Sequence, residues 1–443
     1  MTVAPAANGR RRAFQTRAFA LTWMAYAAYY LCRKNWGVAK ASVEAALGTG
    51  IGGVATIETG YNVAYMLGQS ASGIAGDKLG AKRLLVVGMV ASAACNWWFG
   101  VSTAVPVMFA ALCLNGVAQS TGWPNTVRSM SEWFGPTSRG RVMGLWSTNY
   151  VVGGIAGSAL ASWLIGWGWR WTYLGPAMAL ALLALVFGVL HVSRPADVGL
   201  TAWDPDPADA PPPWPSPSPS SSPSSSLSPS SSVSRAATRA RLLRTPALWA
   251  FGAAYFCLKL IRYTMLFWLP YFLTKRLGYE KSAAGFLSVA FEVGGVVGAL
   301  FAGWLSDRVF GARRVPAAAL LALLLAGALF LYIRVAALGP AANFAGMFLV
   351  GLCLFGPDSL LAGAAAQDLG GRDGAGTAAG MINGIGSAGQ VVQSYLTAWI
   401  ATAYGWDNLF LLFVVLALGC VAVLLPFWRL GGAAPSRASP QPS

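Results

Sequence analysis

Long apolar windows separated by short polar loops dominate the hydrophobic pattern of this chain. Each window holds about 20 consecutive, mostly apolar residues, the length that a helix needs to cross ~30 Å of hydrocarbon. Alternation of period two, the mark of membrane-spanning strands, is absent. The twelve predicted membrane-spanning helices are 17–41, 54–75, 84–102, 105–130, 141–165, 171–192, 246–274, 281–305, 315–335, 342–366, 374–401 and 406–429.

A polar insert divides the windows into two sets of six. It lies at 193–244 and contains the run PPPWPSPSPSSSPSSSLSPSSS. Proline and serine at this density cannot bury a hydrophobic core, so we expect a disordered linker on the cytoplasmic side. The predicted fold is an all-α membrane protein with an N-terminal six-helix bundle at 1–192 and a C-terminal one at 245–443.

An internal repeat relates the two sets of windows. The loop motifs GIAGDKLGAKR at 73–83 and GWLSDRVFGARR at 303–314 start 230 residues apart and follow the second and eighth windows. Arg33 and Arg262 are 229 residues apart and lie in the first and seventh windows. Two such parallel six-helix repeats, with pseudo-symmetric bundles, are an architecture of secondary transporters.

Composition and charge agree with a membrane protein. The chain has 443 residues, of which 56% are hydrophobic and only 10% charged, whereas soluble domains carry about 25% charged residues. The net charge of +16 could indicate a nucleic-acid partner. If residue 1 is cytoplasmic, however, 21 of the 31 Lys and Arg fall in inner segments, as the positive-inside rule requires. We therefore expect both termini inside and no nucleic acid. The six basic residues assigned to outer loops are Lys40, Arg170, Lys275, Arg276, Lys281 and Arg334.

Candidate enzyme chemistry is sparse. The six cysteines are scattered singly through apolar windows without a CxxC pair, so neither a disulfide framework nor a zinc site is indicated. The single histidine, His191, stands at a helix end with no nucleophile or metal-ligand set around it, and a structural role is expected. No catalytic residue, metal or cofactor is predicted.

Four basic residues remain within the windows: Arg33, Lys34, Lys259 and Arg262. A cation at the bilayer centre costs ~2.5–3.5 kcal/mol on insertion scales, so it must face a cavity, form an ion pair or snorkel to the surface. Arg33 lies 16 residues after Arg17, or ~24 Å along a straight helix, which is past the middle of the bilayer. Snorkelling remains an alternative for a single arginine.

The repeat favours a binding role over snorkelling. Two trios share the spacing i, i+4, i+7: Tyr26, Tyr30 and Arg33 in the first half, and Tyr255, Lys259 and Arg262 in the second. At 100° per residue the ends of a trio differ by ~20°, so each trio forms one helical stripe. We expect the arginines to be anion ligands, with Lys259 as a further candidate. Lys34 points ~100° away from Arg33, which favours a helix contact or an ion pair.

Two arginines favour a doubly negative ligand. The guanidinium fork matches phosphate or carboxylate bidentately, and two forks suit a phosphate dianion better than a monocarboxylate. The residues alone therefore predict a carrier for a small organic dianion at the interface of two bundles that alternately open to each side. Glu58, Glu292 and Asp358 could relay protons, but pairing with Lys34 or Lys259, or a helix-contact role, is the expected alternative.

The motifs YAAYYLCRKN, LNGVAQSTGWP, RGRVMGLW, SRPADVGL and LSVAFEVGGVVGALFAGWLSDR resemble the organophosphate:phosphate antiporter family of the major facilitator superfamily. PADVGL, EVGG and GWDNLF favour its sugar phosphate exchanger and glucose-6-phosphate translocase branch. The resemblance implies exchange of a phosphorylated sugar or glycerol phosphate for inorganic phosphate. The alternatives are a sugar-phosphate sensor that does not transport and a proton-coupled organic anion symporter.

The resemblance also implies site residues. The phosphate-binding positions of the family's first and seventh helices fall on Arg33 and Arg262, and tyrosines of its first two helices fall on Tyr26, Tyr30 and Tyr65. Gln69 stands where bacterial members carry a lysine. In the fifth-helix signature Ser147, Tyr150 and Val151 replace Asn, His and Asn, so Tyr150 is a further candidate. A monomer in the plasma (inner) membrane or the endoplasmic reticulum membrane is expected.

Overall fold

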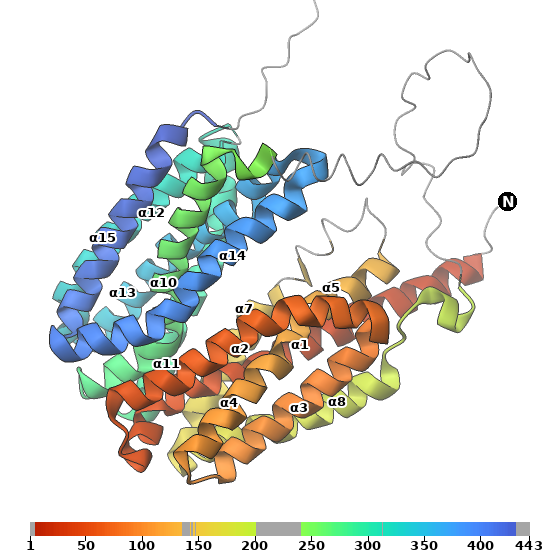
Figure 1. Ribbon diagram of the computed structural model, residues 1–443, viewed down its shortest axis with the longest axis horizontal. Helices are drawn as coiled ribbons and strands as arrows, with labels where there is room; N and C mark the ends of the chain where they lie inside the picture. The colour runs from red at the N-terminus through yellow and green to blue at the C-terminus, as the bar shows by residue number, and fades with distance from the viewer. Residues whose placement is uncertain are drawn as a thin grey trace, which may run out of the picture. The chain divides into compact units, whose positions relative to one another are not determined.

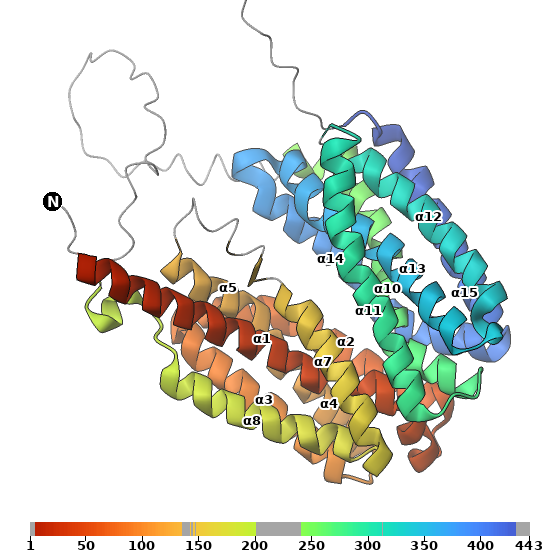
Figure 2. The same cartoon turned by 180° about the vertical axis from the view of Figure 1, so that it is seen from behind.

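The computed structural model describes residues 5–134, 142, 145–146, 148–200, 241–311 and 313–430 (Figures 1 and 2). No strand occurs in these ranges, and the all-helical prediction is confirmed. Contacts divide the chain into a first unit, Met1–Ala39 with Gly60–Pro229, and a second unit, Lys40–Thr59 with Ser230–Ser443. The predicted Ser/Pro linker falls outside the described residues between 201 and 240. The expected domain boundaries stay a prediction.

The first unit is built from seven described helices, of which α1 and α2 run into the segment 40–59. Helix α3 packs against both α4 and α8, and α7 contacts α8 (Figures 1 and 2). The helices are α1 (Pro5–Leu47), α2 (Gly50–Leu79), α3 (Ala81–Val101), α4 (Val105–Ser120), α5 (Gly122–Trp133), α7 (Thr148–Leu164) and α8 (Trp171–Leu190).

The second unit contains the remaining long helices together with the segment 40–59. Its most extensive packing joins α11 to α13 and α10 to α14, while α12 lies against α13 and α15 (Figure 2). A π-helical turn, Leu360–Ala365, connects α13 to α14. The helices are α10 (Pro246–Lys275), α11 (Lys281–Arg308), α12 (Arg314–Val335), α13 (Pro340–Ser359), α14 (Ala366–Ala403) and α15 (Trp406–Leu424).

Nine helical segments of the described chain are long and apolar enough to cross a membrane. One of them, Val105–Met130, combines α4 and α5, as the window 105–130 predicts. The other three predicted windows lie in α1, α2 and α14, which have 43, 30 and 38 residues. Each exceeds the ~20 residues that a membrane crossing requires.

Glycines bring the neighbours of α1 and α10 into close contact. A Cβ on Gly157 of α7 would lie 2.7 Å from the Tyr30 carbonyl oxygen, and one on Gly389 of α14 would lie 2.4 Å from the Phe256 carbonyl oxygen. Small residues allow backbones to approach in this way. The glycine-rich stretches at 153–162 and 374–389 were predicted to form helix contacts. They do so in the first stretch and in the second from 386 onward, whereas the side chains of 374–377 lie outside the described set.

Candidate phosphate-binding clusters

Arg33 lies in a buried aromatic cluster of the first unit. Only 7% of this residue is exposed, and its guanidinium carbon stands 4.7 Å from the ring centroids of both Tyr30 and Tyr65. Its Nε donates to Gln119 Oε1 at 2.8 Å, and Tyr61 donates its hydroxyl to the same oxygen at 3.1 Å. The buried Nη2 has no hydrogen-bond partner in the part of the chain that the structure describes. A buried donor of this kind is costly unless a ligand satisfies it.

The other predicted residues of the first unit lie partly in this cluster and partly in or against an apolar core. Gln69 donates its amide to the Tyr65 hydroxyl at 2.9 Å, so both belong to it. Tyr26 is 4% exposed and contacts Tyr30 at a ring distance of 5.8 Å. It also packs against Trp123, and against Trp146 in the apolar core. Tyr150 is partly buried against the same core.

Arg262 occupies the repeated position in the second unit, but it has an ion-pair partner. Its Nη1 donates to Asp358 Oδ2 at 2.7 Å, and its guanidinium carbon lies 4.3 Å from the Phe355 ring centroid. Asp358 is 6% exposed, and its buried Oδ1 has no hydrogen-bond partner among the described residues. The carboxylate occupies one donor of a guanidinium that has five N–H groups.

Lys259 lies one turn before Arg262 on α10. Its Nζ donates to Asn383 Oδ1 at 2.8 Å and to Ser387 Oγ at 3.1 Å, both on α14, and stands 5.1 Å from the Tyr255 ring centroid. The structure therefore holds Lys259 on neutral oxygen atoms. Lys259 forms no ion pair with a carboxylate of the described chain, and the same is true of Arg33.

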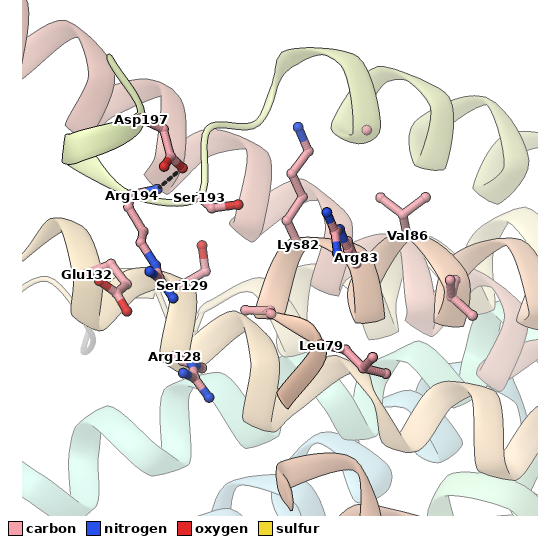
Figure 3. Close-up of a pocket in the computed structure, with 14 residues that line it drawn as sticks. Leu79, Lys82, Arg83, Val86, Arg128, Ser129, Glu132, Ser193, Arg194 and Asp197 are labelled. Atoms are coloured by element: carbon pink, nitrogen blue, oxygen red, sulfur yellow. Dashed lines mark hydrogen bonds between the residues drawn. The ribbon is translucent and has the colours of Figure 1, made fainter. Parts of the chain in front are cut away.

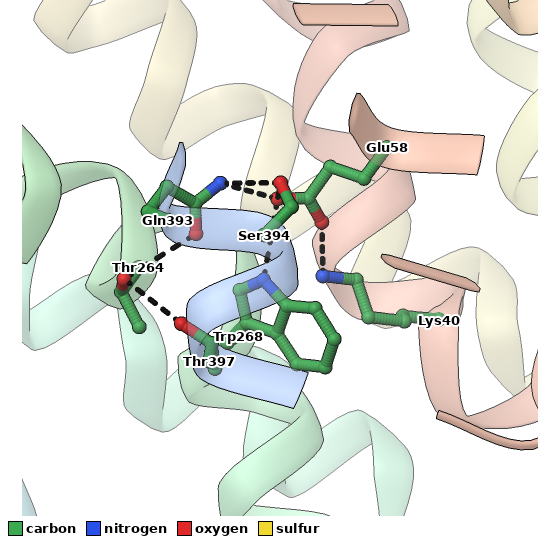
Figure 4. Close-up of polar contacts among 7 residues, drawn as sticks. All are labelled: Lys40, Glu58, Thr264, Trp268, Gln393, Ser394 and Thr397. Carbon is green, nitrogen blue, oxygen red and sulfur yellow. Dashed lines mark hydrogen bonds and ion pairs between the residues drawn. The ribbon is translucent and has the colours of Figure 1, made fainter. Parts of the chain in front are cut away.

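Lys40 and Glu58 form a buried ion pair that the sequence analysis missed (Figure 4). They are 0% and 1% exposed. Glu58 Oε1 also accepts hydrogen bonds from Trp268 Nε1, Gln393 Nε2 and Ser394 Oγ at 3.2, 2.5 and 2.7 Å. The Lys40 ammonium lies 3.5 Å from the Trp268 ring centroid. This Lys40–Glu58 network fixes the segment 40–59 to α10 and α14.

One prediction about charges is corrected by these contacts. Lys40 was assigned to an outer loop, but it lies inside α1 and is fully buried. Glu58, Glu292 and Asp358 were expected to have a pairing or helix-contact role, and the structure shows ion pairs of Glu58 with Lys40 and of Asp358 with Arg262. Both carboxylates are thus engaged in buried ion pairs within the second unit.

His191 follows the last residue of α8 and is 1% exposed. Its Nε2 is 2.8 Å from Ser129 Oγ, and its ring stacks on Phe187 at 4.4 Å. Burial lowers the pKa of His191 from 6.5 to about 4, with the positive charges of Lys82 and Arg17 adding to the effect. The imidazole is therefore neutral at pH 7 and joins α8 to α5.

Sequence reasoning identified the cations but few of their partners. Gln119 lies within the quoted motif LNGVAQSTGWP, and Tyr61 precedes Tyr65 by one turn on α2. Asn383 and Ser387 lie in the glycine-rich stretch that was assigned to helix contacts. These partners could have been sought as polar residues that lie in apolar helices at the level of a repeated cation.

Comparison with known proteins agrees with this architecture. The Major Facilitator Superfamily profile matches residues 22–394. Sugar phosphate exchanger 3 of Gallus gallus is 32% identical over 393 residues, which cover 84% of this chain and 78% of that protein. Putative glycerol-3-phosphate transporter 2 of Arabidopsis thaliana is 30% identical over 434 residues, covering 91% and 84%.

A solved structure shares the fold at low identity. The crystal structure of a bacterial homologue of the human lysosomal transporter Spinster aligns with a TM-score of 0.76 and 12% identity. The alignment covers 96% of this chain and 99% of that one. At this identity the likeness concerns the fold alone.

Proposed function

Because the chain belongs to the major facilitator superfamily, and within it to the organophosphate:phosphate antiporter family, we propose that it exchanges a phosphorylated sugar or glycerol phosphate for inorganic phosphate. The protein is an integral, multi-pass membrane transporter. The relatives named above carry sugar phosphate and glycerol-3-phosphate in their names, which supports this substrate class.

Arg33 is the observation that carries the proposal. The Arg33 guanidinium is 7% exposed and lies beside two tyrosine rings, and its buried Nη2 has no hydrogen-bond partner among the described residues. Such a group is suited to a ligand with strong acceptor oxygens. A phosphate group offers such oxygens in the geometry that the guanidinium fork matches. Tyr65, Gln69 and Tyr30 would orient the organic part of the substrate.

Arg262 and Lys259 would act on the same phosphate from the second half of the repeat. Among the described residues Asp358 forms an ion pair with Arg262, while Arg33 and Lys259 form none with a carboxylate. A phosphate dianion would supply two negative charges to these cations. Asp358 would then compete with the substrate for Arg262, so its carboxylate would lower the affinity for the substrate.

This charge balance supports exchange rather than one-way movement. Alternating access requires the cationic clusters to become enclosed, and enclosing unneutralised like charges carries a large desolvation cost. A bound phosphate ester or inorganic phosphate removes that cost. The loaded carrier would therefore reorient in either direction, and the empty one would not.

Uptake into proteoliposomes with and without internal phosphate tests the proposal. We expect uptake of a labelled sugar phosphate only into vesicles that contain phosphate. A sensor would bind the ester without exchanging it. A proton-coupled symporter would accumulate the ester in phosphate-free vesicles under a pH gradient. Either result would overturn the proposed exchange.

Orientation, membrane and assembly follow as further parts of the proposal. The excess of basic residues in inner segments supports cytoplasmic termini. We propose a monomer in the plasma (inner) membrane or the endoplasmic reticulum membrane. Accessibility of a cysteine introduced near residue 10 to an impermeant thiol reagent, in intact cells against permeabilised cells, tests the orientation.

A further inference from the structure

A basic cavity of about 730 Å³ opens at one end of the first unit, and Arg33 is not among the residues that line it (Figure 3). Its walls are the α2–α3 turn, the start of α3, the second half of α5 and the segment that follows α8. The charged residues that line this basic cavity are Lys82, Arg83, Arg128, Arg194, Glu132 and Asp197.

Positive charge exceeds negative charge in the basic cavity. Four basic side chains face two acidic ones, and the Asp197 carboxylate is engaged by the backbone N–H of Arg194 at 3.0 Å. Neither Lys82 nor Arg83 forms an ion pair with a carboxylate of the described residues. The cavity also borders the first turn of α3, where the helix dipole adds positive potential. The chemistry that fits is a phosphate group.

An apolar groove shares a wall with the basic cavity. Its volume is about 780 Å³, and it runs along α3 and α4 between Leu84 and Trp98. Val87 lines both the cavity and the groove. The groove side chains of Val87, Leu114 and Val117 are 61%, 51% and 48% exposed. The fifteen residues from Leu84 to Trp98 span about 21 Å along α3, which exceeds the ~15 Å thickness of the hydrocarbon in one leaflet.

We infer that the basic cavity and the apolar groove together bind one anionic phospholipid. Its phosphate would lie near Lys82, Arg83 and Arg194, and an acyl chain would follow the groove past Val87. Basic cavities at the ends of membrane helices bind anionic head groups, and contact with the groove adds apolar burial that free phosphate cannot provide. This binding is separate from the proposed transport.

Because the basic cavity is continuous with the apolar groove, a phospholipid fits this site better than a soluble phosphate. A soluble phosphate needs only the basic cavity and leaves the groove exposed to bulk lipid. A phospholipid satisfies the cations and covers the exposed side chains of α3 and α4 at once. Bound in this way, it would join α3, α5 and the segment after α8, which meet at the cavity.

Titration of the purified full-length protein with phosphatidylglycerol, followed by native mass spectrometry, tests the inference. We expect binding of phosphatidylglycerol in preference to phosphatidylcholine. The double variant Lys82→Gln/Arg194→Gln should weaken phosphatidylglycerol binding by about 30-fold, since each basic residue near the surface contributes to the attraction. Lys82→Arg/Arg194→Lys should keep the preference, as should the matched control Arg334→Gln, an exposed cation of α12.

A groove variant distinguishes the lipid from free phosphate. Ala94 is exposed in the groove, and Ala94→Trp should weaken phosphatidylglycerol binding by about 10-fold. Millimolar inorganic phosphate should displace little of the lipid. Unchanged lipid preference in Lys82→Gln/Arg194→Gln would overturn the inference. So would full displacement by inorganic phosphate together with unchanged binding in Ala94→Trp, because these results would assign the cavity to a soluble anion.

Discussion

Arg33 owes its proposed role to geometry as well as charge. A lysine at this position would keep the positive charge but lose the planar fork that reaches Gln119 and, in the proposal, two phosphate oxygens. We therefore expect Arg33→Lys to lower the rate of phosphate exchange by about 10- to 100-fold, the range for loss of one or two charge-assisted hydrogen bonds. Reconstituted exchange kinetics measure this change. Exchange at the wild-type rate would show that charge alone suffices.

Asp358 should oppose substrate binding because it holds Arg262 at 2.7 Å. In Asp358→Asn the amide can still accept a hydrogen bond, but it no longer competes with an anion. We expect the Kd for inorganic phosphate, measured by calorimetry, to fall by about 10-fold. The melting temperature should fall too, because a buried charge loses its partner. A weaker phosphate affinity in a folded variant would contradict this role.

The partners of these residues mark the limit of sequence reasoning. Helical spacing correctly places Tyr30 beside Arg33 and Tyr255 beside Lys259, because both pairs lie on one helix. It cannot find Gln119, which contacts Arg33 from 86 positions away, since periodicity describes a face and not what packs against it.

At the level of elements, the Lys40–Glu58 network fixes the segment 40–59 to the second unit. Two further contacts act in the same direction: Lys275 pairs with Glu44 at 2.8 Å, and Thr56 and Tyr395 share a hydrogen bond of 2.9 Å. The burial of Lys40 was not predicted because a lysine near the end of an apolar window cannot be distinguished by sequence from a lysine in a loop.

Removing one charge of the Lys40–Glu58 ion pair should lower the free energy of unfolding more than removing both charges. Lys40→Met leaves Glu58 buried without its cation, and we expect a loss of about 3–5 kcal/mol in the free energy of unfolding. The double variant Lys40→Met/Glu58→Gln removes both charges and should recover a large part of that loss. Thermal unfolding in detergent measures the cycle. If the losses of unfolding free energy in Lys40→Met and in Glu58→Gln add up to the loss in the double variant, the two charges do not interact.

The end of α8 should be sensitive to acid through His191. The folded pKa of about 4 lies below the ordinary value of 6.5, so the unfolded chain binds the proton more tightly. This contribution to stability is complete above pH 6.5 and is lost as the pH falls through 4, with a total of about 3 kcal/mol. His191→Gln should flatten the dependence of melting temperature on pH in that window. An unchanged pH profile in the variant would contradict the assignment.

For the whole molecule, the sequence was sufficient for the helical fold and the repeat. The windows overlap the observed helices because a membrane span must hold about 20 apolar residues and satisfy its backbone internally. Arg33 and Arg262, which the repeat relates, also have similar surroundings, since each guanidinium lies over an aromatic ring. The repeat could not reveal one difference between the halves. Of the two arginines, Arg262 alone has a carboxylate partner within the described residues of its own unit.

Counterflow of radiolabelled phosphate in proteoliposomes is the most direct test of the proposed site, compared across wild type, Arg33→Ala, Arg262→Ala and the control Arg334→Ala. Both site variants should fold and reach the membrane but lose exchange, whereas the exposed Arg334 can be replaced without loss. Wild-type exchange in either Arg33→Ala or Arg262→Ala would contradict the proposed site, because the proposed transporter would then bind its phosphate elsewhere.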